Sequence, residues 1–212
     1  FNSCSMAAMA SCIEGCLYTA GRGRMNTVQT ARQRKAEWFY RDRVGFMKQL
    51  YHDIQKFSNY CKKRGIQPCV RLNGTTDIRW ELIPAMPHNK MNIFQEFPEV
   101  QFYDYTKIPN RKVADYPNYH LTWSYSAANP KYEELFWDVI RKGMSVAVVF
   151  RKPVNMTTWR GYKVVDGDKD DLRFLDPQSS IVALYAKGAA NMIAQDLCKT
   201  YRRITHVCNT SN

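Results

Sequence analysis

Three cysteines lie within the first 16 residues, and their side chains are the clearest candidates for chemistry in this sequence. Cys4, Cys12 and Cys16 are spaced C-x7-C-x3-C within FNSCSMAAMASCIEGCLYTAGRGR. Thiolates are soft ligands that suit zinc and iron–sulfur clusters. Three of them leave one cluster iron, or one zinc position, open to another ligand. We therefore expect a three-cysteine metal site at the start of the chain.

An iron–sulfur cluster of the four-iron, four-sulfur type is the interpretation we favour for this site, with zinc as the alternative. A closed structural zinc site needs four ligands, commonly as two close pairs, and no second CxxC or HxxxH follows. The other cysteines, Cys61, Cys69, Cys198 and Cys208, stand apart from such a pairing. Three buried thiols that bind no metal are the structural alternative.

Two arginines follow the cysteines directly, in the run Gly21-Arg22-Gly23-Arg24. Glycine lets backbone amides approach a ligand, and guanidinium groups bind phosphate or carboxylate. We expect Arg22 and Arg24 to contact an anionic ligand. A turn with two solvated arginines is the alternative.

Small polar residues gather at three points where a predicted strand ends: in RLNGTTDIRWE, in FYDYTK and in LTWSYS. Parallel strands send their carboxyl ends to one edge of a sheet, where α/β proteins bind ligands. We therefore expect these residues to share one pocket that binds a cofactor. Its predicted members are Asn73, Gly74, Thr75, Asp77, Asp104, Lys107, Ser124 and Ser126.

The segment VVDGDKDDLRFLDP carries five aspartates between residues 166 and 176. It faintly resembles a calcium loop, but the glycine and the terminal glutamate of an EF-hand are out of register. A solvated acidic turn is the interpretation we favour. Of the four histidines none has a close acid or thiol neighbour in sequence, and we expect His120 to be a satisfied core residue.

The elements that must position these residues alternate between helices and short buried strands. The apolar spacing predicts one long helix from Thr30 to Lys63, ended by Gly65, and further helices at 130–142 and 189–203. Strands are predicted at 68–73, 100–106, 119–126, 145–150, 163–165 and 181–185. The pattern predicts an α/β fold with a mostly parallel sheet, forming a partial or distorted β/α barrel with an N-terminal cysteine loop. We expect a single domain, 1–212, with the metal-binding loop at 1–29 and the β/α core at 30–212.

The charge balance points to a polyanionic partner. The 212 residues include 31 Lys and Arg against 19 Asp and Glu, a net charge of +12. Such an excess attracts nucleic acid or a nucleotide-like ligand. No stretch is typical of a signal peptide or a membrane span, so we expect no membrane partner and a reducing, cytoplasmic setting. The chain begins with Phe1 rather than Met, and we expect a segment to precede it.

Five stretches resemble, in this order along the chain, a bacteriophage and prophage family known as gene product 88. They are CxEGCLYTAGRG, RLNGTTDIRWE, VQFYDYTK, NYHLTWSYS and VVDGDKDDLRFLDP. The resemblance implies a phage or mobile-element origin, and therefore the cytoplasm of the host cell. It brings no activity with it.

A more distant likeness is to radical S-adenosylmethionine enzymes, which pair a partial β/α barrel with a three-cysteine loop that holds a four-iron cluster. The cysteine spacing here departs from their usual CxxxCxxC. This likeness implies S-adenosylmethionine at the open iron, oriented by Asn73, Thr75 and Asp77, with Ser124 and Ser126 near its ribose.

Three function classes follow from these observations. The first is an iron–sulfur enzyme that acts on a nucleotide, a nucleic acid or another anionic substrate. The second is a nucleic-acid-binding module with a structural metal, in which the charges at Arg22 to Arg43 and Lys62 to Arg64 carry the affinity. The third is a phage accessory protein that binds a host protein. Strand-end polar residues favour the enzyme, and the net charge favours a binder.

Overall fold

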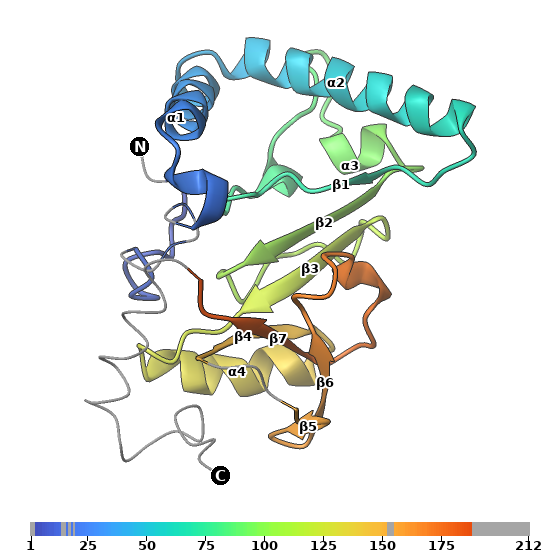
Figure 1. Ribbon diagram of the computed structural model, residues 1–212. Helices are drawn as coiled ribbons and strands as arrows, with labels where there is room; N and C mark the ends of the chain where they lie inside the picture. The colour runs from blue at the N-terminus through green and yellow to red at the C-terminus, as the bar shows by residue number, and fades with distance from the viewer. Residues whose placement is uncertain (1–2, 14–15, 17, 19, 152–154, 188–212) are drawn as a thin grey trace.

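The computed structural model describes residues 3–13, 16, 18, 20–151 and 155–187 (Figure 1). The helix predicted at 189–203 lies outside the described residues, as do Cys198 and Cys208.

A seven-stranded sheet runs through the molecule in the order β1-β2-β3-β4-β7-β6-β5. All neighbouring strands pair in parallel except β5 and β6, which are antiparallel. This confirms the α/β class with a mostly parallel sheet. The predicted barrel is not confirmed, because β1 and β5 are two separate edges of the sheet. The strands are β1 (Cys69–Val70), β2 (Gln101–Thr106), β3 (Tyr119–Ser124), β4 (Val146–Phe150), β5 (Thr158–Trp159), β6 (Tyr162–Asp166) and β7 (Ile181–Tyr185).

The predicted long helix is in fact two helices, α1 (Asn26–Arg41) and α2 (Arg43–Lys63). Asp42 separates them with a non-helical backbone, and its carboxylate accepts a hydrogen bond of 2.8 Å from the Gly45 amide. A side chain at Gly45 would collide with that carboxylate. The prediction of one helix was wrong because the apolar spacing continues through the break, while the Asp cap that starts a new helix leaves the periodicity unchanged.

The remaining elements follow the predicted order with shifted ends. Helix α4 (Lys131–Arg141) and strand β7 match their predictions closely, whereas β1 keeps only two of six predicted residues. The short helix α3 (Ile93–Glu96) was not predicted. It is started by a capping box, in which the side chains of Asn92 and Gln95 each bond the other's backbone amide.

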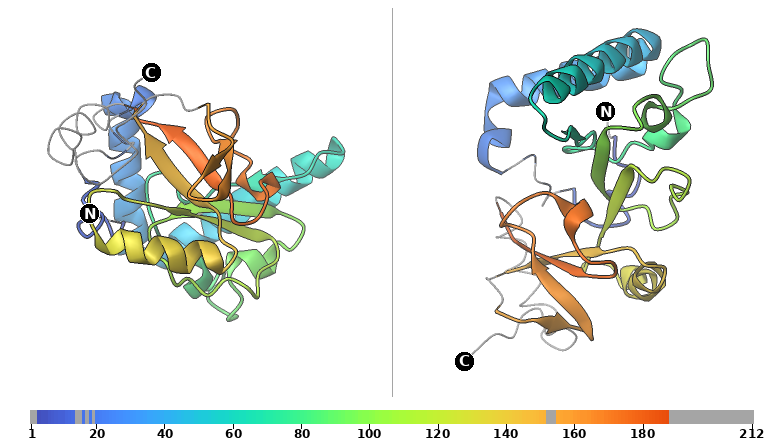
Figure 2. Two further views of the ribbon diagram at one scale, coloured as in Figure 1. Left: turned by 90° about the horizontal axis from the view of Figure 1, so that it is seen from below. Right: turned by 90° about the vertical axis from the view of Figure 1, so that its right-hand side faces the viewer.

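Apolar residues of the helices cover one face of the central strands. Leu121 and Trp123 lie two residues apart on β3, so both point to the same face. Leu121 belongs to a buried cluster with residues of α2 and α3, and Trp123 to a cluster with Phe136 of α4. The right-hand view of Figure 2 shows α3 (green) and α4 (yellow) on one side of these strands and the orange segment that follows β6 on the other.

Among the helices in the described part of the chain, none combines the length and the apolar character needed to cross a bilayer.

Candidate functional site

The N-terminal cysteine loop docks against the carboxyl ends of the parallel strands. The Ser3 carbonyl accepts a hydrogen bond of 3.0 Å from the Asp77 amide, in the segment that follows β1. The Ala10 carbonyl accepts one of 2.6 Å from the Ser126 hydroxyl, which follows β3. The structure thus brings the loop that carries Cys4 and Cys12 to two of the three predicted strand ends.

Lys107, directly after β2, joins the third strand end to this group. Its ammonium nitrogen Nζ donates to the carbonyl (3.0 Å) and the hydroxyl (3.2 Å) of Ser124 and lies 3.4 Å from the Tyr125 carbonyl oxygen. Burial lowers the pKa of Lys107, while the thiols of Cys12 and Cys4 and the Asp77 carboxylate act in the opposite direction. The lysine is therefore a cation held against the sheet edge beside the cysteines.

Asp77 fixes the end of β2 from the other side. Its buried carboxylate accepts hydrogen bonds of 2.8 Å from the Thr106 hydroxyl and from the Lys107 amide. The guanidinium of Arg111 lies 3.5 Å away. These contacts hold Lys107 at one position relative to the cysteine loop.

The three thiols share one electrostatic neighbourhood. Burial raises the pKa of Cys4 to about 11, and Asp77 and Cys12 add to that rise while Lys107 opposes it. Burial likewise raises the pKa of Cys12, with Lys107 opposing and Cys16 adding to the rise. At neutral pH the Cys4 side chain is consequently a neutral thiol, and a bound cation is needed to convert it into a thiolate.

A tyrosine hydroxyl on α4 faces the same neighbourhood. Tyr132 is completely buried, and its hydroxyl has no hydrogen-bond partner among the described residues. Burial raises its pKa to about 12, and Cys12 and Cys4 are the next causes. A buried hydroxyl is normally paired, so this one needs a partner that the protein chain does not supply.

The donor set fits a thiophilic metal by its chemistry. Within the described residues, however, no three His, Cys, Asp or Glu side chains are arranged to hold a metal ion as they stand. Zinc or iron would require the sulfur atoms at about 2.3 Å from the metal. The loop would therefore have to draw Cys4, Cys12 and Cys16 together around it.

Two predicted pocket residues are already occupied by contacts within the protein. The Asn73 side-chain oxygen accepts bonds from Thr76, Ile78 and Trp80, and its nitrogen donates to Ile78 and Asp104. The Asp104 carboxylate accepts bonds from the Asn73 amide at 2.7 Å and, on its other oxygen, from a tyrosine hydroxyl. These contacts give Asn73 and Asp104 a structural role, which is to shape the turn after β1.

Sequence reasoning missed a buried charged network beneath the site. The Arg111 guanidinium donates to the Glu81 carboxylate at 3.0 Å and to the Tyr119 hydroxyl at 2.9 Å, and Tyr119 in turn donates to Asp104. Arg111 and Glu81 are both buried. Neither stands out in sequence, because one Arg and one Glu 30 residues apart carry no spacing signal.

The other predicted site residues lie nearer the surface. Gly74 is exposed, and Thr75 is half-buried. Arg22 and Arg24 belong to the short 3-10 helix η2 (Gly21–Arg24) and are exposed. Neither arginine makes an ion pair with a side chain in the described residues. Their predicted contact with an anionic ligand stays a prediction.

The comparison with protein families is decisive for the origin of the chain. The family described as Gene product 88 matches residues 1–206. The chain belongs to this family. The resemblance seen in the five sequence stretches is thereby confirmed, whereas no curated protein and no solved structure matches the chain. The likeness to radical S-adenosylmethionine enzymes therefore has no support from the comparisons.

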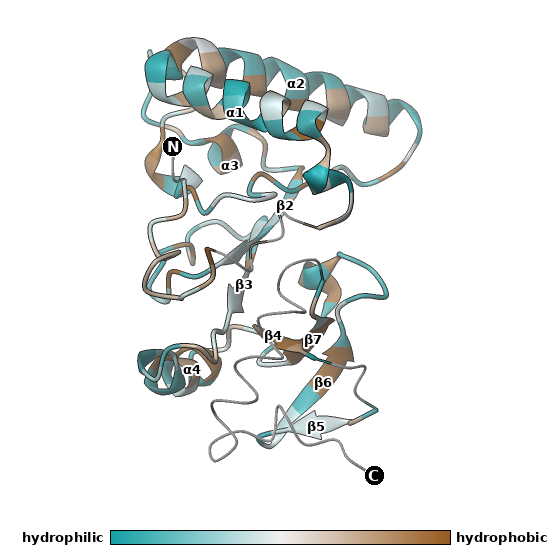
Figure 3. Cartoon of the chain, turned by 60° about the vertical axis from the view of Figure 1, so that its left-hand side comes forward, coloured by the Kyte–Doolittle hydropathy of each residue, from teal (hydrophilic) through white to brown (hydrophobic). Residues whose placement is uncertain are grey.

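The basic charge of this Gene product 88 protein is concentrated in one layer. Residues 21–64, which form η2, α1 and α2, contain 12 Lys and Arg against 3 Asp and Glu, a net charge of +9 out of +12. All 12 basic side chains are exposed. Figure 3 shows hydrophilic residues along the two helices at one end of the molecule. A polyanion could contact this layer without reaching the thiols.

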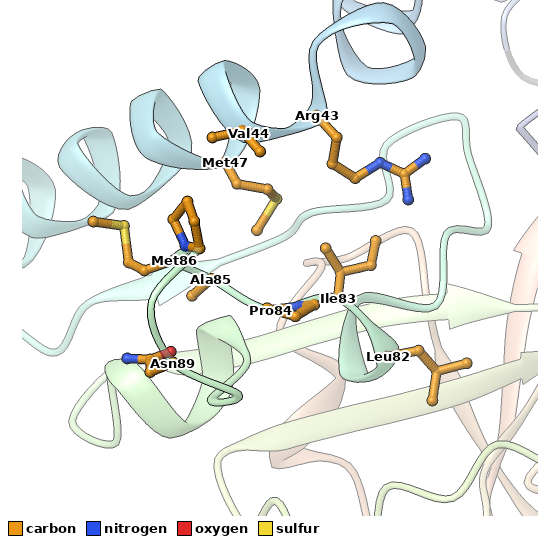
Figure 4. Close-up of a pocket in the computed structure, with 10 residues that line it drawn as sticks. Arg43, Val44, Met47, Leu82, Ile83, Pro84, Ala85, Met86 and Asn89 are labelled. Atoms are coloured by element: carbon orange, nitrogen blue, oxygen red, sulfur yellow. The ribbon is translucent and has the colours of Figure 1, made fainter.

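An apolar groove lies between the start of α2 and the segment after the 3-10 helix η3 (Trp80–Leu82), as Figure 4 shows. Its volume is about 240 Å³, and its lining includes Val44, Met47 and Met86. None of the predicted site residues lines it. The groove is therefore separate from the cysteine site.

Proposed function

We propose that this Gene product 88 protein is an iron–sulfur protein that acts on an anionic substrate, a nucleotide or a nucleic acid. Cys4, Cys12 and Cys16 would hold the cluster at the carboxyl edge of the sheet. The observation that carries the proposal is the grouping of three partly buried thiols with the Lys107 cation and an unpartnered hydroxyl on Tyr132.

Each residue of this group has a role that its position supports. A cluster with three protein ligands would supply an iron with one open coordination position. The Lys107 ammonium would offset the negative charge of the thiolates, and Asp77 holds Lys107 in place through its amide. The Tyr132 hydroxyl could donate a hydrogen bond to a sulfur atom or to a bound ligand, because nothing in the described chain uses it.

S-adenosylmethionine is the cofactor that the sequence likeness suggests for the open iron. Among the residues named for it, Asn73 has its polar atoms in use, while Gly74 and Thr75 remain accessible. Ser124 already bonds Lys107, and Ser126 bonds the cysteine loop. Backbone contacts at Gly74 are consequently the best-supported means of holding such a cofactor. Zinc is the alternative metal.

Anaerobic purification tests the proposal. The protein should be brown, absorb in the visible range and contain several iron and sulfide per chain. A colourless protein with one zinc would reject the cluster and favour a structural metal. A protein without any metal after reconstitution with iron and sulfide would reject both. The reducing cytoplasm of a host cell would suit the cluster, since its thiols must stay reduced.

A second candidate function is nucleic-acid binding without catalysis. The exposed net charge of +9 in residues 21–64 favours it, because phosphate contacts by Lys and Arg supply most of the non-specific affinity. In this case a metal at the cysteines would only fasten the N-terminal loop to the sheet. A host protein as partner is the third candidate, and the apolar groove beside α2 is the surface that suits it.

A further inference from the structure

A second polar cluster lies on the face of the sheet opposite α3 and α4. Tyr105 on β2 and His120 and Thr122 on β3 point to this face, and Tyr105 is the register partner of Thr122. The 3-10 helix η4 (Arg173–Leu175) covers it and places the fully buried Arg173 beside these side chains. Both neighbouring layers are therefore polar where they meet.

The cluster is rich in hydrogen-bond donors that have no partner in the described residues. They are the Tyr105 hydroxyl, His120 Nε2, the Thr122 hydroxyl, Arg173 Nε and NH1, and Arg71 Nε. Buried polar atoms are almost always paired in native proteins. A concentration of unpaired donors at one place therefore indicates that an acceptor outside the chain belongs there.

The potential at this place is positive on the sheet side. Arg173 lies close enough to His120 to help lower its pKa, after burial, which is the larger cause. The Arg71 guanidinium stands over the Tyr105 ring, 4.8 Å from its centroid. Two arginines and three neutral donors form a set that suits an oxyanion, because phosphate oxygens accept several bonds from such groups.

Carboxylates of the acidic turn, residues 166–176, already occupy the rim of the cluster. Asp171 Oδ2 lies 2.7 Å from Arg71 NH1, in a contact where the Asp171 side chain is 47% exposed. Asp176 Oδ2 lies 3.2 Å from Arg173 NH1. The Asp171 pair is at the surface and gives little stability, so an incoming anion could displace it.

We propose that this cluster is a binding site for a small oxyanion, a phosphate group, and that Asp171 takes the place of the anion at Arg71 when the ligand is absent. The acidic turn then acts as the cover of the site and must shift to admit the ligand. The site lies on the sheet face rather than at its carboxyl edge, so the inference does not depend on the metal at Cys4, Cys12 and Cys16.

Calorimetric titration of the full chain with inorganic phosphate tests this site. Asp171→Asn should bind phosphate several-fold more tightly than the unchanged protein, because it removes the competing carboxylate. Tyr105→Phe, which removes only the hydroxyl, should bind several-fold more weakly. Asp138→Asn is the matched control, since Asp138 pairs with Arg141 on the exposed surface of α4, and it should leave phosphate binding unchanged.

Two results would overturn the proposal. The absence of phosphate binding by both the unchanged protein and Asp171→Asn would mean that ordered water alone satisfies the donors. An equal gain in affinity for Asp138→Asn and Asp171→Asn would mean that phosphate responds to net charge and not to this cluster. Thermal unfolding of each variant shows whether it is folded, and Thr122→Val replaces Tyr105→Phe if the latter is not.

Discussion

The Lys107 ammonium donates hydrogen bonds to both the carbonyl and the hydroxyl of Ser124, at 3.0 and 3.2 Å. These bonds connect the ends of β2 and β3 at the place where the cysteine loop docks. Because the thiols and Asp77 surround the same ammonium group, the lysine links the fold to the proposed metal site.

Replacing Lys107 with Met should weaken metal binding about tenfold or more, equivalent to at least ~1.4 kcal/mol. Removal of the cation makes the thiolates harder to form and leaves two backbone carbonyls without a donor. The measurement is the affinity for Co²⁺, followed by its thiolate absorption. Lys142→Met, at an exposed position after α4, is the control. Equal affinities for the two variants would remove Lys107 from the site.

Metal binding should become tighter as the pH rises from 6 to 8. The Cys4 thiol, with its pKa raised to about 11, and the Cys12 thiol, whose pKa is also raised, are protonated in this range. A metal must displace their protons, so each proton released adds close to tenfold in affinity per pH unit. Co²⁺ titrations at several pH values measure this slope. A slope of zero would show that these thiols are not the ligands.

Asp104 should make the protein less stable as the pH rises from about 4 to 6. Burial raises its pKa from 3.8 to about 6, so the folded state keeps a proton that the unfolded state has lost. The free energy of unfolding should therefore fall through this window, by up to about 3 kcal/mol. Urea unfolding of the unchanged protein and of Asp104→Asn at each pH gives the difference. Parallel pH profiles for the two proteins would contradict the assignment.

Nucleic-acid binding, if present, should depend on the basic layer of α1 and α2. Changing Arg32, Arg34 and Lys35 together to Gln should reduce the slope of log affinity against log salt by up to about 3, one unit for each lost phosphate contact. Changing Lys131, Arg141 and Lys142 on α4 gives a control with the same loss of charge. Fluorescence anisotropy with a labelled single strand measures both. Equal losses in the two triple variants would mean that net charge, and no particular layer, attracts the nucleic acid.

The parallel sheet could be predicted because its strands are short apolar runs separated by helical patterns. Strand ends and the break at Asp42 could not, because they depend on single hydrogen bonds that leave the hydrophobic pattern unchanged. Barrel closure was also beyond the sequence, since it depends on whether the two edge strands meet. The order of strands in space is set by packing between distant segments.

The meeting of the cysteine loop with the strand ends followed from topology, since parallel strands end on one side. The roles of individual residues did not follow. Asn73 was expected to contact a cofactor, yet five hydrogen bonds tie it into the turn after β1. His120 was expected to be satisfied, yet its Nε2 has no partner among the described residues. Such differences arise because polar satisfaction depends on exact neighbours.

Iron and sulfide analysis of matched cysteine variants tests the central claim most directly. The pair is Cys12→Ala, within the thiol group, and Cys69→Ala, on β1 outside it. Both would be prepared anaerobically beside the unchanged protein. We expect Cys12→Ala to lose the brown colour and most of its iron and sulfide, and Cys69→Ala to keep both at the level of the unchanged protein. Full iron and sulfide in Cys12→Ala, or their loss in Cys69→Ala alone, would contradict an iron–sulfur site at the N-terminal cysteines.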